Sequence, residues 1–540
     1  MIEEITKRHW DVIVVGTGMG GATIGYALAK AGMSILFCEK GKSARSDDSL
    51  AGCYAEQYIG SSTFPASSER TIFKNAGREW AEIEDRTTSR VKTYIPFIGA
   101  GTGGSTALYG MALERFFPED FTPGICYPHA EDSALPDFWP ITYQDLLPYY
   151  EAAERLYRVR GSVDTLRGAD FHPPYLDPPP LSANAQALSN YLRKQSCHPY
   201  RLPMACEFLA DCNCCQGYLC PRECKNDGRR ICLEPSLGKF GAKLLNECEV
   251  IRLEATRHEV TGVVCTHYGQ TMTLHGNVVI LAAGALFTPK ILLQSASELW
   301  PSGLANRSGQ VGKNLMRHFV DLYAFKSKSH LAGNVEWKEL AFNDYYFAGG
   351  RKLGSVQGFG VLPPVAQLVQ TLAQELRQCS FPSAEFFFKA VKPLLRRYLE
   401  YRLNGSLILA TVTEDLPYAD NRLELGRGGR VQLYYSIRPR ERERIEQMRV
   451  RMRELLKPFR PMLIRQAEKN ERLAHACGTC RFGASSADSV LNEANRAHDL
   501  SNLYVVDASF FPSSAGINPS LTVAANALRV AERITDTKQA

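Results

Sequence analysis

The size and composition of the chain exclude several classes of protein. Its 540 residues are 45% hydrophobic and 22% charged, which is typical of soluble globular proteins and not of disordered or fibrous ones. The formal net charge of +6 is mild for this length and gives no indication of nucleic-acid binding. No apolar run reaches the ~18 to 20 residues that a transmembrane helix needs. Because residues 1–10 are polar and leave no room for a secretory signal, we expect a cytoplasmic protein, or one exported only with a signal-bearing partner.

The N-terminal segment has the pattern of a dinucleotide-binding unit. An apolar run at 11–15 is followed by Gly16-Thr-Gly18-Met-Gly20-Gly21, a helical stretch at 22–30 and a second apolar run at 34–38. The first glycine permits a tight turn, the second lets the backbone approach a pyrophosphate, and the third allows close packing of the helix. Glu39, at the end of the second run, suits ribose hydroxyls. This pattern serves NAD and FAD alike.

Further elements follow in chain order. A second glycine-rich stretch, 99–105, predicts a loop, and the alternating run 430–436, after the turn-like 426–429, predicts a strand of an antiparallel sheet. Two stretches, 366–379 and 384–402, have helical periodicity. Their basic and apolar residues favour amphipathic surface helices over membrane-surface helices. The remaining predicted elements are strands at 278–283 and 503–506 and a helix at 520–534.

Motifs near the C-terminus suggest the family. The stretches 475–483, 503–509 and 516–522 closely resemble the C-terminal signature of the glucose-methanol-choline oxidoreductases. Residues 101–111, 137–154, 279–284 and 311–314 are similar to further motifs of that family, in the same order. The resemblance implies an α/β fold that combines a discontinuous, Rossmann-like FAD-binding domain with a substrate domain containing an antiparallel sheet.

The resemblance also implies domain boundaries. We expect the FAD-binding domain at 1–45, 90–160, 235–318 and 471–540, the substrate or cap domain at 46–89, 161–205 and 319–470, and a cysteine-rich segment at 206–232.

The same resemblance assigns candidate site residues. His475 matches the family histidine that takes the hydroxyl proton of an alcohol while hydride passes to flavin N5, and Asn518 matches its partner. Residues 106–109 contain no histidine that could tether FAD covalently, so we expect non-covalent binding. The residues expected to bind FAD are Gly16, Gly18, Gly21, Glu39, Gly101, Gly103, Gly104, Ser105, Val250, Ala283, Gly284, Asp507, Ala508, Asn518, Pro519 and Thr522.

Seven of the sixteen cysteines lie between residues 206 and 232, and such local clustering predicts a site more than a chain-wide disulfide framework. Four of them have the spacing CC-x4-C-x3-C, which resembles the segment that carries a [3Fe-4S] centre in bacterial FAD-dependent glucose and fructose dehydrogenases. A structural zinc site, disulfides or unligated thiols remain alternatives. Cys206, Cys212 and Cys232 fall outside the matched spacing. The expected metal ligands are Cys214, Cys215, Cys220 and Cys224, three of which would ligate iron.

These expectations together predict an FAD-dependent dehydrogenase that oxidises an alcohol or sugar CH–OH group to a carbonyl. An iron–sulfur relay implies an external electron acceptor such as a quinone, dye or haem protein, possibly with a small partner subunit. The alternatives are an oxygen-using alcohol oxidase of the same family and a non-redox, FAD-containing lyase of the hydroxynitrile type. Peroxide formation distinguishes an oxidase from a dehydrogenase, and bleaching of the flavin by an alcohol distinguishes either from a lyase.

Overall fold

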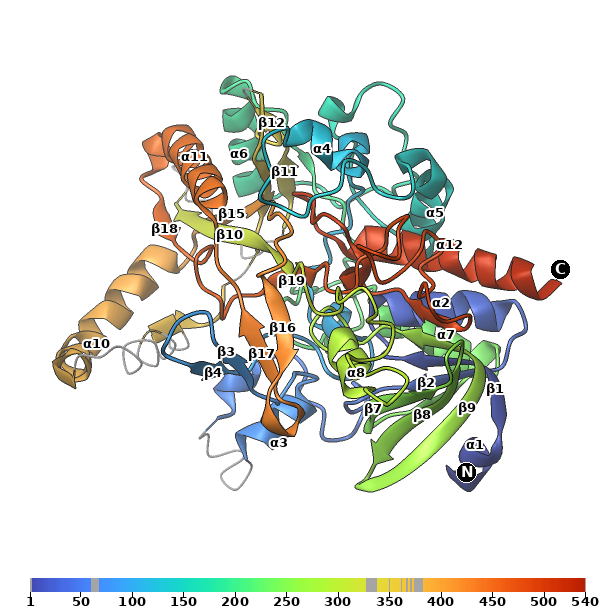
Figure 1. The fold of residues 1–540 in the computed structure, drawn as a ribbon. Coiled ribbons are helices and arrows are strands. Elements are labelled where there is room, and N and C mark those ends of the chain that lie inside the picture. Colours follow the sequence, from blue (N-terminus) through green and yellow to red (C-terminus); the bar gives the residue numbers. More distant parts are fainter. Residues whose placement is uncertain are drawn as a thin grey trace.

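Two large β-sheets organise the protein (Figure 1). The computed structural model describes residues 2–59, 68–326, 338–348, 350–360, 362–365, 368–369, 372 and 382–539. One sheet contains the first and the last strand of the chain, β1 and β20. The other is built from the middle of the chain. In Figure 1 the first sheet lies at the lower right and the second at the upper left.

The first sheet has the strand order β6-β2-β1-β9-β8-β7, and β20 also pairs with β9. Strands β6, β2, β1, β9 and β20 run parallel, whereas β9, β8 and β7 form an antiparallel meander. The continuous apolar runs of β1 and β2 are buried on both faces, as expected for parallel strands. Its strands are β1 His9–Val15, β2 Ile35–Cys38, β6 Lys243–Leu245, β7 Cys248–Ala255, β8 Val260–His267, β9 Gln270–Leu281 and β20 Leu503–Val505.

Helices cover this sheet. α2 packs against the C-terminal α12, and α12 packs in turn against α5 (Figure 1). The N-terminal glycine unit and the last helix are therefore neighbours, which explains why motifs from both ends of the chain meet at one edge of the sheet. The helices of this region are α1 Ile2–Lys7, α2 Met19–Lys30, α5 Tyr143–Leu156, α7 Glu234–Lys239, α8 Thr288–Gln294 and α12 Ser520–Gln539.

The second sheet is antiparallel throughout, with the order β18-β10-β15-β14-β11-β5, and β19 pairs with the start of β10. Helices α6 Ala183–Lys194 and α11 Pro439–Leu455 share a hydrophobic cluster with its strands. Its strands are β5 Tyr200–Arg201, β10 Met316–Phe325, β11 Leu340–Phe342, β14 Gly354–Gly358, β15 Leu407–Thr413, β18 Met462–Ile464 and β19 Ala474–Cys477.

Smaller elements complete the fold. A four-stranded sheet has the order β16-β17-β3-β4, and β12 pairs with β13. In Figure 1 the helix α10 projects from the body of the protein. These elements are β3 Ile83–Asp85, β4 Lys92–Tyr94, β12 Phe347–Ala348, β13 Arg351–Lys352, β16 Arg422–Leu425, β17 Val431–Tyr434, α3 Glu69–Asn75, α4 Pro123–Cys126 and α10 Pro382–Leu403.

The predicted α/β class, the parallel sheet and the antiparallel sheet are confirmed. The strand predicted at 278–283 overlaps only the last four residues of β9, which ends at Leu281. The earlier part of β9 was not predicted because its residues are more polar and form a hairpin with β8 around Gly269. The helix predicted at 384–402 is confirmed as α10, which continues through Pro393. The helix predicted at 366–379 falls mostly outside the described residues.

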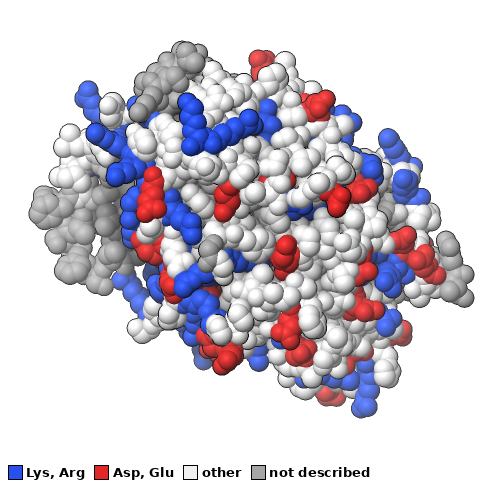
Figure 2. Space-filling model, turned by 90° about the horizontal axis from the view of Figure 1, so that it is seen from above, with Lys and Arg blue, Asp and Glu red and all other residues white. Residues whose placement is uncertain are grey.

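The surface carries charges of both signs. Figure 2 shows Lys and Arg interspersed with Asp and Glu over the face viewed from above, in keeping with the mild net charge. Among the helices whose residues are described, none is both long and apolar enough to cross a membrane.

Candidate active site

The turn between β1 and α2 combines tight packing with open space. Gly16 has φ +96°, and a methyl group added there would lie 2.4 Å from the carbonyl oxygen of Ala282. A methyl group on Gly21 would lie 2.1 Å from the carbonyl oxygen of Gly16. In contrast, nothing lies within 4 Å of a methyl group on Gly18. Gly16 and Gly21 are therefore needed for close packing of the backbone. Gly18 leaves free space at the N-terminus of α2, a position that favours a bound pyrophosphate.

The second glycine stretch lies across this turn. The Gly103 N–H donates to Thr17 Oγ1 at 3.2 Å, and a methyl group on Gly104 would lie 2.8 Å from the Gly18 Cα atom. Gly103 and Gly104 have φ +90° and +52°, a conformation that favours glycine. Gly101 bridges to Lys42, and Ser105 Oγ accepts from the Gly99 N–H at 3.1 Å. The structure thus brings the two predicted glycine stretches together.

Glu39 occupies the end of β2, beside the same turn. Its Oε2 accepts from the Thr17 N–H at 3.0 Å and the Thr17 hydroxyl at 2.5 Å. Its Oε1 accepts only a long bond, 3.3 Å, from the Gly41 N–H, so this oxygen keeps the capacity to accept from a ribose hydroxyl. Burial raises the pKa of Glu39, while the bonds from Thr17 oppose that effect.

Residues after β9 and in the C-terminal motif form the other wall of the proposed FAD-binding site, which we call the cofactor cradle. Val15 of β1 pairs with Leu281 of β9 in parallel register, so the turn after each strand leaves from the same edge. Gly284 has φ +85° and nothing within 4 Å of an added methyl group. Its N–H donates to Asp507 Oδ2 at 2.9 Å, and burial raises the pKa of Asp507. The open positions beside Gly18 and Gly284 allow the pyrophosphate and flavin portions of FAD to approach the backbone.

The remaining predicted FAD residues surround this edge or support it. Ala283 and Ala508 adjoin Gly284 and Asp507 in the chain, and Pro519 precedes α12. Thr522 is fully buried and its hydroxyl bonds with that of Tyr150 at 2.7 Å. Val250 is buried within β7. Direct contact of these residues with FAD stays a prediction.

His475 lies in β19 at a local distortion of the antiparallel sheet. Met316 pairs with Cys477 and His318 with Ala474, so two residues of β19 oppose one residue of β10, as in a β-bulge. His475 itself has φ +57°, which is uncommon for a residue with a side chain. Bulges and such conformations occur often beside active sites, where they direct a side chain.

The neighbour of His475 was not predicted from the sequence. His318 Nδ1 lies 2.8 Å from His475 Nδ1, and His318 Nε2 lies 3.1 and 2.9 Å from the carbonyl oxygens of Ser514 and Ala515. Because carbonyl oxygens only accept, His318 carries its proton on Nε2. Burial lowers the pKa of His318, so the ring is neutral and its Nδ1 is an acceptor.

The hydrogen-bond chain therefore fixes the tautomer of His475. Its Nδ1 must hold a proton to donate to His318, and in a neutral ring this leaves Nε2 without one. Burial, and secondarily the neighbouring His318 and Lys338 side chains, lower the pKa of His475 well below its usual value. His475 is thus a neutral imidazole with Nε2 available to accept a proton. The only sequence signal for His318 was its place just after the family-like stretch 311–314.

Asn518 is paired with a residue of the second sheet. Its Nδ2 donates to Gln357 Oε1 at 2.7 Å, and Gln357 Nε2 lies 3.3 Å from Asn518 Oδ1. Both side chains are nearly fully buried, so their amides are held in place. Asn518 follows closely after the Ser514–Ala515 carbonyls that anchor His318, and the two predicted catalytic residues thus share one loop as support.

The cysteine segment gathers sulfurs, but in a different grouping from the predicted one. The Sγ atoms of Cys206, Cys212 and Cys214 all lie within 4.8 Å of one another. Sulfur–sulfur hydrogen bonding lowers the pKa of Cys206 to about 5, chiefly through Cys212, and that of Cys220 to about 5, chiefly through Cys215. Sequence reasoning left Cys206 and Cys212 out because they lie outside the matched spacing.

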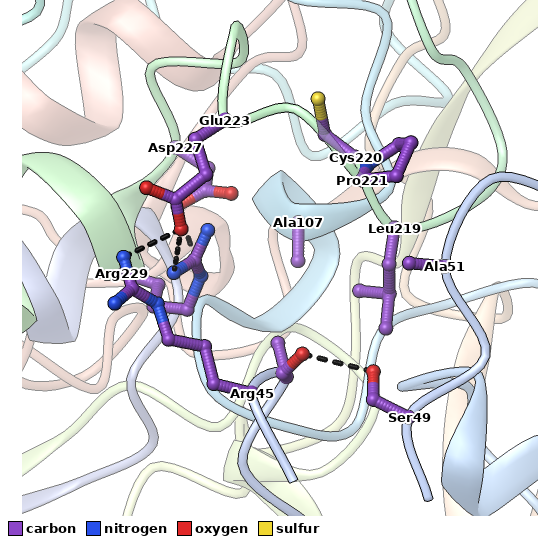
Figure 3. A pocket seen from close by; sticks show the side chains of 11 residues that line it. Arg45, Ser49, Ala51, Ala107, Leu219, Cys220, Pro221, Glu223, Asp227 and Arg229 are labelled. Carbon is purple, nitrogen blue, oxygen red and sulfur yellow. Dashed lines mark hydrogen bonds and ion pairs between the residues drawn. The ribbon is translucent and has the colours of Figure 1, made fainter. Parts of the chain in front are cut away.

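A surface pocket adjoins the cysteine segment (Figure 3). It has a volume of about 170 Å³ and is lined by residues that follow β2, by Ala107 of the second glycine loop, and by residues 219–229. Arg45 and Glu223 form an ion pair of 2.5 Å at the pocket, and Cys220 also lines it. Behind it, the buried Lys225 Nζ donates to the Ala107 carbonyl oxygen at 2.8 Å. The segment is therefore close to both the glycine loop and the solvent.

Comparisons with known proteins agree with this geometry. Sequence models of GMC oxidoreductases match residues 203–320 and 417–527. The chain belongs to the GMC oxidoreductase family. It is therefore an FAD-binding oxidoreductase, from a family that acts on the CH–OH groups of alcohols and sugars.

Relatives of this GMC protein extend over nearly its whole length. It is 27% identical over 549 residues to the 6'''-hydroxyparomomycin C oxidase of Streptomyces lividus, covering 98% of this chain and 91% of that protein. It is 24% identical over 571 residues to the fructose dehydrogenase large subunit of Gluconobacter japonicus, covering 98% of each. A crystal structure of pyridoxine 4-oxidase from Mesorbium loti has a TM-score of 0.62 at 18% identity, covering 98% of this chain and 99% of that chain, which shows the shared fold.

The GMC fold also bears on how FAD is retained. In the second glycine loop, Tyr109 donates its hydroxyl proton to the Asn226 carbonyl oxygen at 2.6 Å, and residues 105–111 contain no histidine. We predict that acid or heat denaturation releases FAD intact into the supernatant, measured by absorbance and fluorescence after the protein is precipitated. Flavin that stays with the precipitate would contradict non-covalent binding.

Proposed function

We propose that this GMC oxidoreductase is a dehydrogenase that oxidises a CH–OH group to a carbonyl and passes the electrons to an external acceptor. The observation that carries the proposal is the 2.8 Å contact between the Nδ1 atoms of His475 and His318, from which we infer that Nε2 of His475 carries no proton. A positioned neutral imidazole is a competent general base for an alcohol hydroxyl.

The proton path uses this chain's own residues. As the carbon–hydrogen bond breaks, the hydroxyl proton goes to His475 Nε2 and the oxygen becomes a carbonyl oxygen. The Asn518 amide, held by Gln357, would hold the same oxygen as negative charge develops there. Bound FAD supplies the hydride acceptor. Gly18, Gly284 and the Oε1 atom of Glu39 are the groups best placed to hold it.

An iron–sulfur centre would carry electrons from the reduced flavin to the external acceptor. Three sulfurs within 4.8 Å of one another form a soft ligand set that suits iron. Cys220 of the same segment lines a surface pocket together with Ala107 of the glycine loop. Named dehydrogenases among the relatives, including the fructose dehydrogenase large subunit, support this choice. We propose a [3Fe-4S] centre held by cysteines of the 206–224 segment, and a quinone, dye or haem protein as acceptor.

An oxygen-using oxidase is the second candidate. It is favoured by relatives named as oxidases, such as the paromamine 6'-oxidase of Streptomyces fradiae, 25% identical over 548 residues. Peroxide released in proportion to substrate would identify this candidate. The substrate that we propose is a small alcohol or sugar.

The base is tested by His475→Ala. Removing a positioned general base lowers rates by about 10²- to 10⁴-fold, so we predict that loss in the anaerobic rate of flavin reduction by an alcohol, measured by stopped flow. FAD content should remain near one per chain. If FAD is lost together with activity, His475 is structural. An unchanged rate of flavin reduction would refute the role of base.

The electron exit is tested by two cysteine variants. We predict that Cys206→Ser/Cys212→Ser/Cys214→Ser, which removes the three sulfurs that lie together, loses iron and most transfer to a large one-electron acceptor, yet retains anaerobic flavin bleaching. The same losses in Cys215→Ser/Cys220→Ser/Cys224→Ser instead would assign the ligands to the spacing predicted from the sequence. Cys53→Ser, outside the segment, is the matched control. Wild-type protein that contains zinc or no metal after anaerobic preparation from iron-supplied cells would contradict the relay.

A further inference from the structure

Three lysines are buried in the described part of the chain, and one of them, Lys338, is near an aromatic ring but no counter-charge: its Nζ lies 5.6 Å from the centroid of the Phe359 ring. Lys352 lies within 2.7 Å of two buried carboxylates, and Lys225 donates to two backbone carbonyl oxygens. Lys338 is only 7% exposed, and among the described residues it forms neither a hydrogen bond nor an ion pair. A buried ammonium group without a counter-charge is strongly unfavourable, so a missing anion is the simplest explanation of Lys338.

The ammonium group of Lys338 faces a second unsatisfied group. A methyl group added to Gly110 would lie 2.1 Å from Lys338 Nζ and 2.7 Å from Gln216 Oε1, so both atoms lie over the same glycine. Gln216 Oε1 is buried without a hydrogen-bond partner. Two polar groups without hydrogen-bond partners among the described residues thus lie close to one point, where a further polar group could satisfy both.

This point lies beside the proposed catalytic residues. Gly110 continues the second glycine loop, and a methyl group on Gly358 would lie 3.3 Å from the Lys338 Cα atom. Gly358 adjoins Gln357, which holds Asn518. The charge of Lys338 also contributes to the lowered pKa of His475. Lys338 therefore lies near His475 and the Gln357–Asn518 pair, where the alcohol is proposed to react.

We propose that Lys338 and Gln216 form an anion subsite and that the alcohol substrate carries a carboxylate. This inference rests on the proposed function, since the occupant is the alcohol that His475 deprotonates. One carboxylate oxygen accepts from Lys338 Nζ. The other oxygen accepts from Gln216. Rotating the Gln216 amide by a half-turn exchanges its oxygen and nitrogen, so that Nε2 takes the place of Oε1 and can donate.

The sulfurs of the cysteine segment are the competing counter-charge. Cys214 lies two residues before Gln216, and its charge would favour the protonated form of Lys338. As a ligand of the proposed iron–sulfur centre, Cys214 would be a thiolate and would supply part of the charge that Lys338 needs. A carboxylate satisfies Gln216 as well, which a sulfur at Cys214 does not.

The test uses holoenzyme titrated with acetate, with acetamide as the neutral isostere, followed by the flavin absorption spectrum and the thermal unfolding midpoint. Wild-type protein should show saturable binding of acetate and none of acetamide. Lys338→Met should raise the acetate dissociation constant by about 10- to 100-fold, as expected for loss of a charged hydrogen bond, and Gln216→Ala by about 3- to 10-fold. Lys243→Met, an exposed lysine on β6, is the matched control.

A second measurement compares glycolate with ethylene glycol, which share a CH₂OH group and differ in charge. Lys338→Met should lower the ratio of their kcat/KM values by the same factor as acetate binding. The anion subsite is overturned if the wild type does not bind acetate or if Lys338→Met binds it equally well. If Lys338→Met changes only the iron content, Lys338 serves the cysteine segment instead. If acetate binds but no alcohol bleaches the flavin, the proposed function fails and the subsite stands.

Discussion

The hydrogen bond between His318 Nδ1 and His475 Nδ1 is the interaction on which the proposed chemistry depends. Left-handed backbone such as that of His475 is unfavourable by about 1–3 kcal/mol, whereas one net hydrogen bond contributes about 0.5–1.5 kcal/mol. The bond alone does not offset the strain. The pairing of β19 with β10 and the two carbonyl oxygens that hold His318 must therefore position the pair together.

The cofactor cradle obeys a complementary constraint. At Gly16, Gly21 and Gly104 a side chain would collide with backbone, whereas at Gly18 and Gly284 it would enter open space. The first group closes the fold tightly around an edge of the parallel sheet, and the second leaves room there for a ligand. Because β1 and β9 are adjacent, motifs more than 260 residues apart contribute to one cradle.

Much of this arrangement could be predicted from the sequence because the signals are local. The turn at Gly16–Gly21, the acidic residue at Glu39 and the family signature around His475 each lie within a few residues. His318, Gln357 and Lys338 could not be found in this way, because their roles arise from contacts across the sheet with residues more than 100 positions away. The sulfur grouping was missed for a different reason: the prediction followed the family-like spacing from Cys214 to Cys224, which leaves out Cys206 and Cys212, although both lie close to Cys214 in the fold.

The central claim is that His475 is a neutral base whose Nε2 carries no proton. The most direct measurement is ¹⁵N NMR of the holoenzyme labelled at histidine, with the His475 signals assigned by their loss in His475→Gln. The account predicts a neutral ring at pH 7 with a protonated Nδ1 and an unprotonated Nε2, persisting below the usual histidine pKa because burial and neighbouring charge lower the pKa of His475. A proton on Nε2, or an imidazolium at neutral pH, would contradict it.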